Sequence, residues 1–240
     1  MTVLVLGATG GIGGALARRL AESGHSVHLA GRDAGRLEAL AAELGAPSSV
    51  CDVLDEASLA RTVAEAGAGG MLAGLAFCVG SIVLKPLGRA GAEDHLDAYR
   101  LNVLAAARAV ALAAGALKAG RGAIVLFSSI AARVGFPNHA VIGPVKAAVE
   151  GLTVALAAEL APAVRVNCIA PSLTRTAMAA PLTDNAAMAK AIAAQHPIPR
   201  LGEAEDAAAL AAFLLGPESG WITGQVIGVD GGRSSLRSKG

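Results

Sequence analysis

The chain has 240 residues, of which 54% are hydrophobic and 2% aromatic, and its formal net charge is +1. This length suits one α/β domain that spans residues 1–240 and buries an extensive core. The near-neutral charge and the scarcity of aromatic residues argue against nucleic-acid binding, which needs a basic surface or stacking rings.

Residues 3–13 predict a strand, a glycine-rich turn and the start of a helix. An apolar run over 3–6 ends at Gly7, and helical periodicity over 15–21 follows further glycines. Backbone N–H groups beside a helix N-terminus favour a pyrophosphate, and side chains at Gly7, Gly11 or Gly13 would hinder its approach. The chain has 30 glycines, so a plain turn is the alternative. The strand-to-helix junction favours nucleotide binding.

The residues after a second predicted strand, 26–30, bear on the choice of cofactor. The strand ends without the acidic residue that would accept a free ribose hydroxyl, and Arg32 follows. A guanidinium there can pair with a 2′-phosphate and stack on adenine, which favours NADP(H). Thr9 offers its hydroxyl to the same phosphate. The alternatives are a solvated Arg32 and an Asp33 that turns inward.

The next segments predict a helix over 34–44, a strand over 49–53, a helix over 56–66 and a strand over 72–79. Asp52 is expected to accept the adenine amino group while Val53 packs on the ring. An N-cap role for Asp52 is the alternative, although Asp55 or Ser58 could serve instead. Gly80 lets backbone pass close to the cofactor.

An alanine-rich helix is predicted over 94–118. Asn102 in its first half needs a hydrogen-bonding partner unless it lies at the surface. The apolar run over 101–117 carries Arg108 and indicates a helix packed on its neighbours rather than a membrane span.

The remaining predicted elements are strands at 124–127, 165–169 and 225–229, helices at 141–160 and 203–215, and a mobile segment at 174–200 that contains three prolines. Cys51, Cys78 and Cys168 are widely spaced, which favours buried thiols over disulfides or a metal site and indicates a reducing cytoplasm.

Strands and helices alternate along the whole chain. This order predicts a Rossmann-type, doubly wound parallel sheet of about seven strands with helices on both faces. Ligands bind at the carboxyl ends of such strands. That edge gathers the following residues: Gly7–Gly13, Arg32, Asp52, Gly80, Ser129 and Pro171.

With these residues at one edge, the chain resembles the short-chain dehydrogenase/reductase family over its whole length. The matching motifs are Gly7-xxx-Gly11-Ile12-Gly13, Asp52-Val53, Asn102-Val103, Ser128-Ser129, Lys146, Asn167 to Pro171 with Thr176 beyond, and Ile222 to Gln225 leading to Val229-Asp230-Gly231-Gly232. The resemblance implies hydride transfer between the nicotinamide of the cofactor and a carbonyl or alcohol carbon. It implies that Ser129 polarises the carbonyl, that Lys146 holds the ribose, and that Asn102 holds a relay water. It also implies cofactor contacts from Ile12, Pro171, Thr174 and Thr176.

The family's general acid, a tyrosine, has no counterpart at its expected position. The tyrosine normally follows the serine by thirteen positions and precedes the lysine by four, and both counts lead to Ile142. The one tyrosine, Tyr99, lies three residues before Asn102. Milder departures are Leu6 for a threonine, Cys78-Val79-Gly80 for Asn-Ala-Gly, and Ser172 for a glycine.

Two further side chains near this position have alternative explanations. His139 precedes Ile142 by three residues, which places both on one helix face, so its imidazole could supply the proton. A histidine that caps or packs at the loop–helix junction is the alternative. For Lys146, the alternative to holding ribose is an ion pair with Glu150.

The sequence thus supports two functions. The first is an NADP(H)-dependent oxidoreductase that acts on a small carbonyl, imine or conjugated substrate with atypical proton delivery. The second is a catalytically inactive NADP(H)-binding sensor or assembly protein. We expect segment 174–200 to close over a small-molecule substrate. The helices over 94–118 and 141–160 are apolar nearly all round and must be covered. The resemblance implies that they pair in a homotetramer, with a dimer as alternative.

Overall fold

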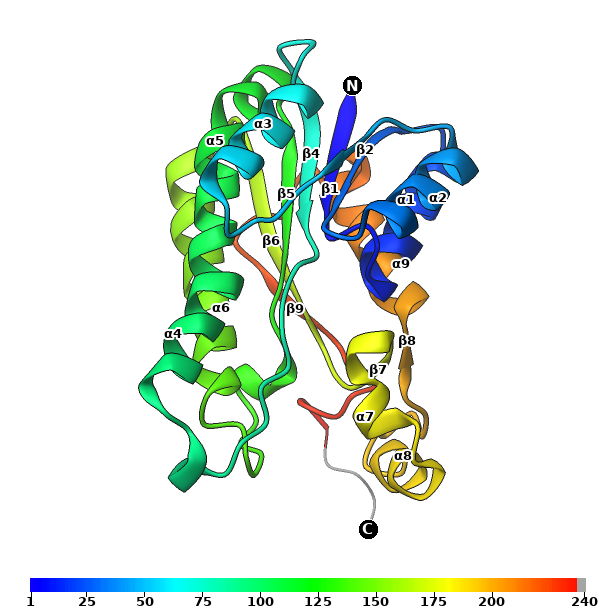
Figure 1. The fold of residues 1–240 in the computed structure, drawn as a ribbon, viewed down its shortest axis with the longest axis vertical. Helices are drawn as coiled ribbons and strands as arrows, with labels where there is room; N and C mark the ends of the chain where they lie inside the picture. Colours follow the sequence, from blue (N-terminus) through cyan, green and yellow to red (C-terminus); the bar gives the residue numbers. More distant parts are fainter. Residues whose placement is uncertain (237–240) are drawn as a thin grey trace.

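The computed structural model describes residues 1–236 and contains a parallel sheet between two layers of helices (Figure 1). The strand order is β3-β2-β1-β4-β5-β6-β9. The strands are β1 (Thr2–Leu6), β2 (Ser26–Gly31), β3 (Ser48–Val50), β4 (Leu72–Phe77), β5 (Ala123–Phe127), β6 (Arg165–Pro171) and β9 (Val226–Val229). The predicted Rossmann-type fold is confirmed.

Helices cover both faces of the sheet. One face carries α1 (Gly11–Glu22), α2 (Ala34–Leu44) and α9 (Ala204–Leu215), and the other carries α3 (Glu56–Ala66), α4 (Ala92–Tyr99), α5 (Ala105–Gly120) and α6 (Ile142–Leu160). Side chains alternate between the two layers along each strand. In β1, Val3 and Val5 join the core under α1, whereas Leu4 and Leu6 join the core under α5.

Two strands end earlier than predicted because their neighbours turn away. β3 ends at Val50 rather than at residue 53, since its partner β2 stops at Gly31. β4 ends at Phe77 rather than at residue 79, since β1 gives way to the turn at Gly7.

The helix predicted over 94–118 runs from Ala92 to Gly120 and contains a π-helical turn, Arg100–Leu104, between α4 and α5. By length and composition this stretch could cross a membrane. Ala109, Ala113 and Leu117 are nevertheless fully buried in the core against the sheet. It is therefore packed as the core helix that the sequence predicted.

Segment 174–200 is more regular than the predicted mobile stretch. It contains β7 (Thr174–Arg175), α7 (Ala180–Thr183) and α8 (Ala186–Ala193), and β7 pairs with β8 (Gly202–Glu203). These elements lie beyond the carboxyl ends of the central strands (Figure 1). They therefore cover the edge at which a ligand is expected.

The last strand is held in place by a buried amide. Asn167 on β6 is fully buried, donates from Nδ2 to the Ile222 carbonyl at 2.9 Å and accepts from the Gln225 N–H at 3.1 Å. The Val166 N–H donates to the Thr223 hydroxyl at 3.0 Å. The motif 222–225 therefore directs the chain into β9.

Candidate active site

A cavity of about 320 Å³ lies at the carboxyl edge of the sheet. Many of the predicted site residues line it: Ile12, Gly80, Ser129, His139, Lys146, Pro171, Thr174 and Thr176. The remaining predicted residues lie in the glycine turn, after β2, after β3 and in the π-helical turn: Gly7, Thr9, Gly11, Gly13, Arg32, Asp52, Val53 and Asn102.

The glycine turn is too tightly packed to accept side chains. An added Cβ on Gly13 would lie 2.2 Å from the Gly7 carbonyl oxygen, and one on Gly11 would lie 2.6 Å from Cγ2 of Thr176. Gly7 has a φ of +83° and lies against the Cys78 backbone. The glycines thus bring β4, the segment after β6 and the start of α1 together.

Helix α1 begins inside this turn, earlier than the periodicity over 15–21 predicted. Its N-cap is Gly10, which supplies no side-chain hydrogen bond. The first N–H groups of a helix have no intrahelical partner and carry a partial positive charge. The turn therefore fits a dinucleotide pyrophosphate.

Two arginines follow β2, and only one was predicted as a cofactor ligand. Arg32 is exposed and makes no hydrogen bond or ion pair with residues 1–236, whereas Arg36 donates to the Thr9 carbonyl at 2.6 Å. The inward turn considered for Asp33 is wrong, because its carboxylate caps α2 by accepting the Arg36 N–H. The Thr9 side chain lies against Gly31, where an added Cβ would be 2.9 Å from its Oγ1.

Asp52 and Val53 lie in the loop after β3. The N-cap role considered for Asp52 is wrong, because Asp55 caps α3 through its carboxylate. Asp52 is half-buried and accepts the Leu54 N–H at 3.0 Å. Val53 is buried.

Asn102 lies in the π-helical turn and is 2% exposed, so the surface position considered for it is wrong. Its Nδ2 donates to the Ala98 carbonyl at 2.9 Å and to the Ser81 hydroxyl at 3.0 Å. A wide turn inside an α-helix is a frequent feature of functional sites. Here it fixes the Asn102 amide beside the cavity.

Gly80 was predicted to let the backbone pass close to the cofactor, but neighbouring protein groups also restrict the space around it. An added Cβ would lie 2.9 Å from Asn102 Oδ1 and 3.2 Å from Lys146 Nζ. Gly80 therefore allows the amide and the ammonium to converge on one point of the cavity wall.

Lys146 is a buried cation. Its Nζ donates to the Phe127 carbonyl at 3.1 Å, and burial lowers the pKa of Lys146 to about 8. The ion pair considered with Glu150 is wrong, because that carboxylate pairs with Arg133 at 2.7 Å. The remaining ammonium protons are available to ligand hydroxyls.

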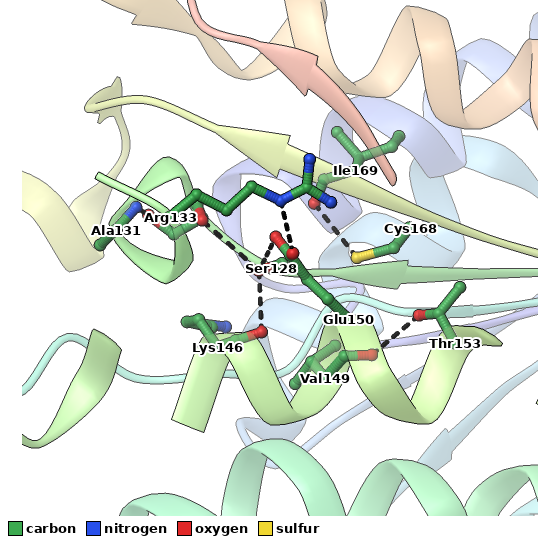
Figure 2. A network of polar contacts seen from close by, with 10 residues as sticks. Ser128, Ala131, Arg133, Lys146, Val149, Glu150, Thr153, Cys168 and Ile169 are labelled. Carbon is green, nitrogen blue, oxygen red and sulfur yellow. Dashed lines mark hydrogen bonds and ion pairs between the residues drawn. The ribbon is translucent and has the colours of Figure 1, made fainter. Parts of the chain in front are cut away.

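A polar network beneath Lys146 escaped the sequence analysis (Figure 2). The Ser128 hydroxyl lies 2.9 Å from the Lys146 carbonyl and 3.1 Å from Glu150 Oε1. Arg133 binds the other Glu150 oxygen, so the network joins the loop after β5 to helix α6. Only the fold brings these residues together.

Ser129 lies next to this network and lines the cavity. Its oxygen accepts the Ala131 N–H at 3.2 Å. Because that contact uses a lone pair, the hydroxyl proton remains free to polarise a bound carbonyl.

Ile142, the first residue of α6, is buried and lines the same cavity. Tyr99 lies on α4 and is 48% exposed. His139 lines the cavity and packs on Phe136, and its Nδ1 lies 2.7 Å from the Pro137 carbonyl. A carbonyl only accepts, so Nδ1 carries a proton. The structure therefore combines the two explanations considered for His139, junction packing and access to the pocket.

The segment after β6 supplies further polar groups. Thr174 is buried and donates to the Ser172 carbonyl at 3.0 Å. Ser172 also contacts His196 and Arg233, neither of which the sequence analysis selected. The one sequence signal for this cluster was Ser172, which stands where the family usually has a glycine.

The cysteines are free thiols rather than disulfides. Burial raises the pKa of Cys78 and of Cys168 to about 12, so neither is a thiolate nucleophile near neutral pH. Within residues 1–236, no group of three or more His, Cys, Asp or Glu side chains could hold a metal ion.

The sequence profile of a family described as Enoyl-(Acyl carrier protein) reductase matches residues 7–234. A tropinone reductase homolog of Arabidopsis thaliana is 36% identical over 240 residues, which cover 96% of this chain and 91% of that protein. The solved structure of a short-chain type dehydrogenase/reductase from Mycobacterium ulcerans superposes with a TM-score of 0.93 at 35% identity, covering 99% of this chain and 90% of the other. The structure of a gluconate 5-dehydrogenase from Burkholderia cenocepacia, solved with NADP and tartrate, superposes with a TM-score of 0.91 at 27% identity. The match covers 98% of this chain and 95% of the other.

Proposed function

The chain belongs to the short-chain dehydrogenase/reductase family of oxidoreductases, and we propose that it moves a hydride between NADP(H) and a small carbonyl, imine or conjugated substrate. The observation that carries this proposal is one cavity bordered by the glycine turn, the Ser129 hydroxyl and the Lys146 ammonium. When bound, the cofactor supplies the hydride. The protein then has to bind, orient and protonate the substrate.

The residues present fit a dinucleotide. The close-packed glycines leave the amino end of α1 uncovered for a pyrophosphate, and Lys146 lies where its ammonium can donate to ribose hydroxyls. The preference for NADP(H) is supported by the uncommitted guanidinium of Arg32 at the end of β2. The related gluconate 5-dehydrogenase was solved with NADP.

Proton delivery is the unusual part of the proposed reaction. Ile142 lies at the cavity and has no proton to give. His139 is the titratable group that we assign to this task. Its Nδ1–H is held by the Pro137 carbonyl, which leaves Nε2 to exchange a proton directly or through a water. Ser129 polarises the accepting atom.

Segment 174–200 is proposed as the lid of the site. Thr176 lies against Gly11, and Met178 and Leu182 line the cavity. Closure of this segment would exclude water from the reacting groups.

The assembly is proposed to be a homotetramer, with a dimer as alternative. Leu104, Leu112 and Val154 are exposed apolar side chains on the helices over 92–120 and 142–160, and Trp221 before β9 is 100% exposed. Burial of such groups between copies would stabilise the assembly. The free thiols support a reducing, cytoplasmic setting.

The experiment that tests this function separates cofactor binding from turnover. Purified protein is titrated with NADPH, and oxidation of NADPH is followed with ketone, imine and enone substrates. Saturable binding with turnover that falls at least 10-fold in His139→Gln is the expected result. Saturable binding without turnover on any substrate would favour the inactive sensor or assembly protein. Absence of saturable binding would overturn both functions.

A further inference from the structure

The cavity has a cation at its wall that hydride transfer does not require. Arg233 lines the cavity and follows β9, where Gly231 and Gly232 pack against His196, Pro197 and Ile198. Its guanidinium carbon lies 4.8 Å from the centre of the Phe136 ring, and its amino groups contact the Ser172 hydroxyl and the Gln195 side-chain carbonyl. These three contacts hold the planar group at the cavity.

This cation has no ion-pair partner among the described residues, although the nearby Asp230 attracts it electrostatically. Six other arginines form ion pairs, but no carboxylate within residues 1–236 comes within 4.0 Å of Arg233. The nearby Asp230 accepts instead from the Gly232 and Ser234 N–H groups at 2.9 and 3.0 Å. A half-buried guanidinium whose direct partners are neutral retains affinity for an anion.

The partners of Arg233 are themselves fixed. His196 is 3% exposed, and its Nδ1 lies 2.9 Å from the Ile192 carbonyl, which requires a proton on Nδ1. Nε2 lies 2.8 Å from the Ser172 hydroxyl. In the neutral imidazole Nε2 accepts the Ser172 proton, so the serine oxygen turns its lone pairs to Arg233. The serine orients the guanidinium without cancelling its charge.

Most of the rest of this wall is apolar, although Thr174 and Thr176 also line the cavity. The apolar side chains come from the loop after β4 and from segment 174–200: Ile82, Leu84, Met178, Leu182 and Ile192. Such a lining favours a ligand with an apolar body and few polar groups. Arg233 therefore supplies the positive charge at this part of the cavity.

We propose that the Arg233 subsite binds a carboxylate of the substrate, so that the enzyme acts on an oxo acid, or on the matching hydroxy acid in reverse. This inference rests on the proposed function. The carboxylate pairs with Arg233 in two-pronged geometry, an apolar stretch lies along Ile82 and Leu182, and the oxo group reaches Ser129. Hydride adds to the oxo carbon while its oxygen takes up a proton.

The test compares oxo acids of graded chain length with their methyl esters. In the unmodified protein, kcat/KM and equilibrium affinity at saturating NADP(H) should favour the best acid over its ester by about 10- to 100-fold. Arg233→Met keeps the apolar stem and should abolish this preference, with the ester kinetics changed less than about threefold. Arg233→Lys should restore part of it. Arg61→Met, an exposed arginine on α3 that does not line the cavity, is the matched control.

The binding arm, measured by calorimetry, distinguishes this inference from the proposed function. Preferential binding of acids without turnover would support the carboxylate subsite and overturn the proposed oxidoreductase function. Equal affinity for acid and ester, or a preference that survives in Arg233→Met, would overturn the subsite. A loss of NADPH affinity in Arg233→Met would assign the guanidinium to the cofactor and would also overturn it.

Discussion

Gly80 and Asn102 approach so closely that a Cβ on the glycine would lie 2.9 Å from the asparagine Oδ1. The same Cβ would lie 3.2 Å from Nζ of Lys146. The amide and the ammonium are thus packed around a position that has room for hydrogen alone.

Replacing Gly80 with alanine should displace one or both of these groups. We expect Gly80→Ala to lower stability by about 1–3 kcal/mol through overpacking and to weaken NADPH binding, since Lys146 moves. Urea unfolding and cofactor titration measure the two effects. Gly69→Ala is the control, because Gly69 has open space around it and no positive φ. Equal behaviour of the two variants would show that the crowding at Gly80 has no consequence.

Ile142→Tyr tests the assignment of the missing general acid. A phenol at the first residue of α6 would enter the cavity beside Ser129 and Lys146. We expect ketone reduction to rise by about 10²- to 10⁴-fold, the usual contribution of a positioned acid. Ile142→Phe supplies the ring without the hydroxyl and should stay at the original rate. A similar rate in both variants would place the family's acid elsewhere.

Arg32→Gln tests the choice of cofactor. If the guanidinium pairs with a 2′-phosphate, its loss should weaken NADPH binding by about 10- to 100-fold and leave NADH binding unchanged. Arg36→Gln is the informative comparison, because Arg36 supports the Thr9 carbonyl in the turn. That variant should weaken both cofactors equally. Equal loss of NADPH and NADH in Arg32→Gln would contradict the assignment.

Lys146→Met should stabilise the cofactor-free protein at pH 7. Burial lowers the pKa of Lys146 from 10.5 to about 8, so below pH 8 the folded state carries the full cost of a buried charge, about 3 kcal/mol. Loss of the hydrogen bond to the Phe127 carbonyl lowers the stability of the variant by about 1 kcal/mol. The free energy of unfolding of the variant should therefore be higher by about 2 kcal/mol. The same variant should bind NADPH more weakly.

The sign of this effect predicts its pH dependence. Between pH 8 and 10.5 the unfolded lysine binds more protons than the folded one, so the stability of the unmodified protein rises with pH and the advantage of Lys146→Met shrinks. Urea unfolding at pH 7 and pH 10 measures the change. Lys118→Met removes an exposed lysine from α5 and should show no such trend. If Lys146→Met were less stable than the unmodified protein at pH 7, this result would contradict the proposed cost of burying the Lys146 charge.

The sequence predicted the sheet and the glycine turn because both depend on local patterns. The run over 3–6 is apolar throughout, and glycine spacing marks the junction after it. The short helices within segment 174–200 were not predicted; Pro181 lies in the first turn of α7, where no N–H is needed.

The side chains that sequence reasoning missed meet only through the fold. Glu150 and Lys146 have helical spacing, yet the arginine that binds Glu150 comes from the loop after β5. Arg233 and Phe136 lie nearly a hundred positions apart and form one cation–π pair. No periodicity or short motif encodes such contacts.

The exposed indole of Trp221 has a practical consequence, because it is the only tryptophan in the chain. Indole fluorescence can then come from a single position, next to the final strand. Solvent-relaxed, red-shifted emission would mark a free subunit, and a blue shift with rising protein concentration would mark burial of that surface. The unlabelled protein therefore carries its own optical reporter of self-association.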